Sequence, residues 1–179
     1  MEIAFPALKR RPAPRLSYLI DLAGRLIDVD GEIDLYEFCF YRILVSNLGQ
    51  ASDPSRRLKT RRGAREPVRR AATSLLRVIA EHGHADDDGR RRAYEAGIAV
   101  FGKWGAKYPY ESGQKSSVDV LDKSLETLLA LNSKGKRMLL EAVTATVMSD
   151  KTLSVSEAEL IRAICASLDC PLPPILINR

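Results

Sequence analysis

The chain has few cysteines, few aromatic residues and no long apolar run, and each shortage excludes a class of protein. Three Cys in 179 residues cannot form the disulfide framework of a small secreted scaffold, and no two of them have C-x-x-C spacing. The N-terminal segment lacks the apolar core of a signal peptide, and no apolar run approaches the roughly 20 residues that span a bilayer. We therefore expect a cytoplasmic chain that meets a membrane only through a partner.

Recognisable catalytic motifs are also missing from the sequence. It has no Gly-rich phosphate loop, no dinucleotide fingerprint and no arrangement of Ser, His and Asp for nucleophilic catalysis. The two histidines, His82 and His84, are followed by the acidic run from Asp86 to Asp88. This run could hold a borderline metal, but the end of one helix and the acidic start of the next is the interpretation we favour. We expect a chain that is not an enzyme and has no resident cofactor.

The net charge of +5 is concentrated in one segment. The 18 residues from Asp53 to Arg70 hold eight basic and two acidic residues, which leaves 20 basic against 21 acidic residues elsewhere. The stretch has Pro and Gly as helix breakers and no aromatic residue, so nucleic acid is an unexpected partner. We predict a flexible, exposed basic loop over residues 53–66. The alternative is a tether that binds an anionic membrane surface.

The rest of the sequence has helical periodicity and no convincing alternation typical of a strand. We predict an all-α fold, a single-domain bundle of about seven helices over residues 1–179. The predicted helices begin near Pro14, after a cap at Asp34, at Pro67, at the acidic run, after Ser116 or Ser117, at Ser133 and at Ser154. The second should end at Gly49 and the third at Gly83. The fourth should carry Phe101 and Trp104 on one face and continue to Tyr108, with Trp104 either in the core or exposed as a partner-binding anchor.

An internal repeat links the first and last helical hairpins across 120 residues without gaps. Asp30 aligns with Asp150, Ile33 with Leu153, and Gly31 with Lys151. The helix caps Asp34 and Ser154 also align, each with a Glu three positions later, Glu37 and Glu157, which is the spacing of a capping box. Two pseudo-repeated hairpins that lie close together are therefore expected in the bundle.

The same acidic turns suggest a second use for these carboxylates. The pattern from Asp28 to Glu37 partly matches the end of a calcium-binding EF-hand loop, although neither copy alone offers the six or more oxygens that such a cation needs. Helix capping is the interpretation we favour. The alternative is a divalent-cation sensor in which the two turns meet and share the candidate ligands Asp28, Asp30, Asp34, Glu37, Asp150 and Glu157.

Two segments carry a resemblance to a known family. The segments IDVDGEIDLYEFCFYRIL and VMSDKTLSVSEAELIRAICASLDCPLPP resemble the hallmark segments of the TerB-like domain at the C-terminus of HtpX-like peptidases, bacterial zinc metalloproteases embedded in the membrane. The similarity covers nearly the whole chain, and the Arg-rich stretch is its least family-like part. It implies an all-helical accessory domain whose acidic turns bind a cation or a partner.

The departure from that family is as informative as the match. The peptidases place two His and one Glu on a helix as H-E-x-x-H, and His82 and His84 cannot make this zinc site. The chain is therefore either a fragment of such a protease or a free-standing relative that works beside one. We expect a non-catalytic interaction or regulatory domain whose partner is a membrane-embedded metalloprotease or another protein.

Overall fold

The computed structural model describes residues 5–27, 35–52, 65–113 and 118–173, and within these ranges the fold is all-α with no strand. Most helices bury one apolar stripe against their neighbours, as the periodicity of the sequence predicts, whereas the helix over residues 13–27 buries only Leu16 completely. The elements are α1 (Phe5–Leu8), α2 (Ala13–Ile27), α3 (Leu35–Ser52), α4 (Arg65–Gly83), α5 (Asp87–Ala99), the 3-10 segment η1 (Gly102–Lys107), α6 (Val118–Leu129), α7 (Ser133–Val147), the 3-10 segment η2 (Met148–Asp150) and α8 (Val155–Ser167).

The seven predicted helices correspond to α2 to α8, with errors at three boundaries. Helix α3 does not end at Gly49 but continues to Ser52, because packing of the buried Leu48 and Gly49 outweighs the weak helix propensity of Gly. Helix α4 begins at Arg65, two residues before Pro67, since Pro is tolerated in a first turn whose amides have no intrahelical partner. The predicted loop over 53–66 is thus wrong at its last two residues, and residues 53–64 lie outside the described ranges.

The predicted fourth helix is wrong beyond Ala99. Helix α5 ends there, Gly102 adopts a left-handed backbone with φ of 59°, and the chain continues as η1. Glycine has no Cβ and so accepts this conformation without strain. Phe101 and Trp104 consequently do not share a face of one α-helix but lie at the turn between α5 and η1 and within η1.

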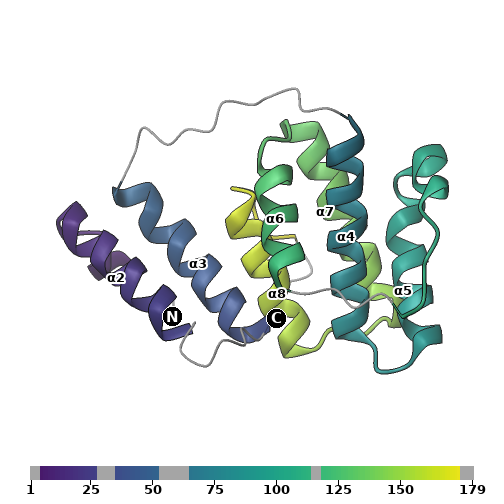
Figure 1. Ribbon diagram of the computed structural model, residues 1–179, viewed down its shortest axis with the longest axis horizontal. Coiled ribbons are helices and arrows are strands. Elements are labelled where there is room, and N and C mark those ends of the chain that lie inside the picture. The colour runs from purple at the N-terminus through teal and green to yellow at the C-terminus, as the bar shows by residue number, and fades with distance from the viewer. Residues whose placement is uncertain (1–4, 28–34, 53–64, 114–117, 174–179) are drawn as a thin grey trace.

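The helices pair in an order that differs from their order in the sequence (Figure 1). Helix α4 packs against α5, α6 and α7, and α7 packs extensively on α5. Helix α3 joins α2 to the rest of the bundle by packing on α8. A partly exposed ion pair helps to fix this junction, because the Arg42 guanidinium on α3 lies 3.3 Å from Asp122 on α6 and donates a hydrogen bond of 3.2 Å to Ser167 on α8.

The two sequence repeats meet through their second helices, α3 and α8, which pack against each other. Their internal packing differs, because α2 lies along α3, whereas α7 makes few contacts with α8 and packs on α4 and α5. A small separate core of Phe5, Leu16 and Leu48 stabilises the first hairpin, while the main core lies among α3 to α8. Among the helices that the structure describes, each is too short or too polar to cross a bilayer.

Candidate functional site: an apolar groove beside the start of two helices

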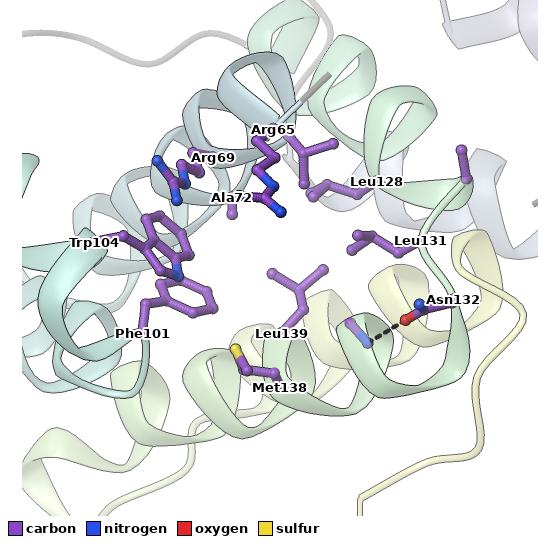
Figure 2. Close-up of a pocket in the computed structure, with 13 residues that line it drawn as sticks. Arg65, Arg69, Ala72, Phe101, Trp104, Leu128, Leu131, Asn132, Met138 and Leu139 are labelled. Atoms are coloured by element: carbon purple, nitrogen blue, oxygen red, sulfur yellow. Dashed lines mark hydrogen bonds between the residues drawn. The ribbon is translucent and has the colours of Figure 1, made fainter. Parts of the chain in front are cut away.

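A groove of about 710 Å³ opens between α4, η1 and the corner that joins α6 to α7 (Figure 2). Both α4 and α7 begin at this groove, because Arg65 is the first residue of α4 and Asn132 is the N-cap of α7. Most of its lining is apolar. The lining residues are Arg65, Val68, Arg69, Ala72, Phe101, Trp104, Leu128, Ala130, Leu131, Asn132, Gly135, Met138 and Leu139.

One wall of the groove is a stack of aromatic rings. The rings of Phe101 and Trp104 lie nearly parallel, with their centroids 4.3 Å apart, and the ring of Tyr108 meets Trp104 edge-on at 6.0 Å. The guanidinium carbon of Arg69 lies 5.4 Å from the centroid of the Trp104 ring, which is within reach of a cation–π interaction. These contacts hold Trp104 in one position while leaving part of its surface in the groove, as Figure 2 shows.

The opposite wall comes from the corner between α6 and α7. Leu128 and Leu139 are fully buried below it, whereas Leu131 and Met138 are only half-buried. A helix cap stabilises the corner, because the Asn132 side chain accepts a hydrogen bond of 2.9 Å from the backbone amide of Gly135 at the start of α7. The groove therefore has a preformed apolar floor with several incompletely covered side chains.

The charge around the groove is positive. Its lining includes two cations, Arg65 and Arg69, and no carboxylate, and within the described part of the chain neither Arg has an ion-pair partner. The first turn of α7 contains no acidic residue and is followed closely by Lys136 and Arg137. The positive end of the α7 dipole adds to these charges. An anionic group in the groove would meet a favourable potential from both sides.

The neighbouring carboxylate of Glu66 does not neutralise this potential from within the groove. It is not among the lining residues, and it accepts hydrogen bonds of 2.9 Å from the Tyr108 hydroxyl and 3.1 Å from Arg70. The hydrogen bond from Tyr108, followed by that from Arg70, lowers the pKa of Glu66 below its ordinary value. Glu66 therefore stays ionised and is hydrogen-bonded to these two partners, and from outside the lining its charge also attracts that of Arg69.

The candidate cation ligands are divided between described and undescribed parts of the chain. Asp28, Asp30 and Asp34 lie outside the described residues, and Glu37 lies in the first turn of α3. In the acidic turn of the second repeat, before α8, the Asp150 carboxylate accepts hydrogen bonds of 2.9 Å from the Thr152 amide and 2.8 Å from the Thr152 hydroxyl. These bonds lower the pKa of Asp150 and turn its oxygens toward its own loop.

Glu157 serves the helix cap that its spacing predicts. Its carboxylate accepts a hydrogen bond of 2.8 Å from the Ser154 amide, while the Ser154 hydroxyl accepts one of 3.2 Å from the Glu157 amide, so the capping box of α8 is confirmed. Across residues 5–27, 35–52, 65–113 and 118–173, no three His, Cys, Asp or Glu side chains gather closely enough to hold a metal ion.

The two histidines lie at the end of α4, as their sequence context predicts. His82 Nδ1 is 2.8 Å from the carbonyl oxygen of Val78 one turn earlier, and His84 Nε2 is 3.2 Å from the Ser149 hydroxyl on η2. Asp86 then caps α5 by accepting a hydrogen bond of 2.7 Å from the Gly89 amide. The run from His82 to Asp86 thus ends one helix and begins the next.

No protein-family model, no curated protein and no solved structure matches this chain. The site must therefore be interpreted from its own geometry. Sequence reasoning singled out Trp104 but missed the groove, because its walls come from segments as many as 74 residues apart, from Arg65 to Leu139. The one signal available in the sequence was an aromatic pair, Phe101 and Trp104, next to two glycines in a short segment between helices.

Proposed function

We propose that this chain is a non-catalytic helical interaction domain that binds a partner protein in the groove of α4, η1, α6 and α7. The observation that carries the proposal is the lining itself, in which Trp, Phe, Met and Leu side chains lie beside two arginines without ion-pair partners among the described residues. Aromatic residues, Met and Arg are the types enriched at the centres of protein interfaces.

The incomplete burial of the groove also favours a binding role. Val68, Trp104, Leu131 and Met138 pack on the main core but keep part of their surface uncovered. Covering apolar surface contributes about 25 cal/mol for each Å² removed from water, so a partner seated here would gain from several side chains at once. Cap and core contacts already hold both walls, and little ordering would oppose binding.

A finer form of the proposal comes from the resemblance to the TerB-like domain. On that basis the partner is a membrane-embedded zinc metalloprotease, and the domain acts on the cytoplasmic side of the membrane as a regulatory or substrate-recruiting accessory. This assignment rests on resemblance in two segments, IDVDGEIDLYEFCFYRIL and VMSDKTLSVSEAELIRAICASLDCPLPP, rather than on the groove.

Photo-crosslinking in the native host tests both the proposal that a partner binds in the groove and the finer proposal of which protein that partner is. A photoreactive amino acid replaces Val68 in the groove or, as a matched control, the exposed Arg92 on α5. We expect a discrete adduct from position 68 that is absent from position 92 and is lost when Leu131→Glu places a charge in the groove. Melting curves of the Leu131→Glu variant confirm that it remains folded.

The identity of the adduct separates the two levels. A zinc metalloprotease of the membrane would support the finer proposal, whereas a different protein would reject it and leave the groove as the binding site. Equal cross-linking from positions 68 and 92, or an adduct that persists in Leu131→Glu, would contradict binding in the groove.

A further inference from the structure

We infer that the groove selects an acidic amphipathic segment, in which apolar side chains fill the floor and a carboxylate pairs with Arg65 and Arg69. This inference rests on the proposed function and adds the chemistry of the occupant. Its basis is charge complementarity, because the lining is apolar apart from two cations and the Asn132 cap and includes no carboxylate.

The two arginines differ in what they can offer such a segment. Arg69 is half-buried and its guanidinium lies over the Trp104 ring, so it is held in place before any ligand arrives. Arg65 is exposed at the start of α4 and, as Figure 2 shows, reaches toward the centre of the groove between Arg69 and Leu128. Arginine has a planar fork that pairs bidentately with a carboxylate, which makes this pair a specific recognition site as well as a source of charge.

The start of α7 favours the same ligand from the other side. The Asn132 side chain already accepts the hydrogen bond of the Gly135 amide, so α7 does not need an acidic residue as its cap. Its first turn also contains no acidic residue, so no carboxylate there offsets the positive end of the helix dipole. Lys136 is engaged with the carbonyl oxygen of Leu168, and Arg137 pairs with Glu141. A carboxylate seated in the groove would therefore be stabilised mainly by the two arginines and by the dipole of α7.

The lining favours a protein segment over a single-chain lipid. A lipid tail needs an apolar channel along its length, whereas here the apolar surface is a short floor between an aromatic wall and the leucines of the α6–α7 corner. A helix that presents apolar residues at i, i+3, i+4 and i+7 offers a short apolar row with adjacent polar positions for Glu or Asp. Such a helix matches the apolar floor of the groove, which has Arg65 and Arg69 at one side.

Selection from a random peptide library tests the inference without assuming a partner. A displayed library of about 16 random residues, long enough for anchors over two helical turns, is selected on the full chain and counter-selected on Leu131→Glu. We expect the enriched peptides to combine Leu, Ile, Phe or Met at helical spacing with Glu or Asp. Trp104 is the chain's single Trp, so its fluorescence reports whether a synthetic copy of an enriched peptide occupies the groove.

Charge reversal then examines the role of the arginines. We expect Arg65→Glu to weaken binding of an acidic peptide by about tenfold or more and to restore binding of the same peptide with its Glu changed to Lys. The control Arg92→Glu makes the same change of charge at an exposed site on α5 and should change the affinity for the peptide by less than about twofold. Arg65→Glu should fold normally, because an acid suits the first turn of α4.

Each remaining outcome has a distinct meaning. Enriched peptides without acidic residues, or an Arg65→Glu variant that binds them unchanged, would overturn the carboxylate inference while leaving the groove as an interaction site. Failure to enrich any peptide that discriminates against Leu131→Glu would overturn peptide binding in the groove altogether. If dodecanoate displaces the bound peptide at a lower concentration than a free copy of the same peptide does, the groove is assigned to a lipid and the inference is rejected.

Discussion

Gly97 of α5 lies directly against Thr146 of α7, so that a Cβ atom at position 97 would collide with the Thr146 hydroxyl. The carbonyl oxygen of Ala142 lies only 2.9 Å from the same Cβ position, which leaves no direction in which a side chain could fit. This contact lets α5 and α7 pack closely and brings the end of α5, with Phe101, to the groove. The absence of one side chain thus helps to set the position of the aromatic wall.

Gly97→Ala should destabilise the protein by about 1–3 kcal/mol, the usual cost of overpacking a well-packed core. The matched control is Gly24→Ala in α2, where the added Cβ would have ordinary contacts of 3.5 Å with Tyr41 and should add about 0.4–1 kcal/mol of stability. Urea denaturation measures both changes. Equal effects at the two glycines would contradict the close approach of α5 and α7.

Lys151→Gly should stabilise the turn between η2 and α8 by about 0.5–1 kcal/mol. Lys151 has a left-handed backbone with φ of 63°, which costs a residue with a Cβ about 1–2 kcal/mol, and Gly removes this cost at the expense of some unfolded-state entropy. Lys151→Ala keeps the strain and serves as the control for loss of the charge. A Gly variant no more stable than the Ala variant in thermal melting would contradict the prediction.

Ser154→Ala should destabilise the protein by about 0.5–2 kcal/mol, the range observed for loss of an N-cap. The Ser154 hydroxyl accepts a hydrogen bond from the backbone amide of Glu157. Without the hydroxyl, this amide at the start of α8 has no hydrogen-bond acceptor from the cap. Ser156→Ala changes an exposed serine in the first turn of the same helix and should have little effect. Chemical denaturation of the two variants side by side gives the comparison, and similar midpoints would argue against the capping box.

Tyr108→Phe should raise the pKa of Glu66. The Tyr108 hydroxyl donates the hydrogen bond that contributes most to the lowered pKa of Glu66, and Phe keeps the ring that contacts Trp104. A lowered carboxyl pKa in the folded state adds stability above the unfolded pKa, and this contribution is lost as the pH falls through the folded value. Titration of the Glu66 carboxyl by NMR measures the change. The exposed Tyr18→Phe is the control, and a Glu66 pKa that is the same in all three proteins would refute the assigned cause.

A thiol reagent should modify only one cysteine of the native protein, and the reaction should be slow. Burial raises the pKa of Cys165 to about 12 and also raises the pKa of the half-buried Cys170, while Cys39 is buried in α3. Because the thiolate is the reactive form, we expect a single slow reaction near pH 8 that Cys170→Ser abolishes, and three reactive thiols after unfolding. Rapid labelling of two or three cysteines in the native protein would contradict this burial.

Local sequence signals predicted those features that depend on neighbouring residues. The helical periodicity, the helix starts at the acidic run and at Ser133, and the capping box of Ser154 with Glu157 are confirmed, because a helix cap is formed by groups three residues apart. The burial of Cys165 on the last helix also follows from its place in an apolar stripe. These features are encoded within a few turns of chain and need no distant partner.

The tertiary structure decided where those helices stop and which of their faces meet. Gly102 ends a helix whose periodicity in the sequence continues, because Gly makes the left-handed turn available and packing of Phe101 and Trp104 stabilises the altered path. The pairing of α3 with α8 and the closeness of Gly97 to Thr146 are likewise relations between distant segments. The groove exists only because α4, η1 and the α6–α7 corner meet, and a periodic stripe specifies that a face is buried without specifying against what.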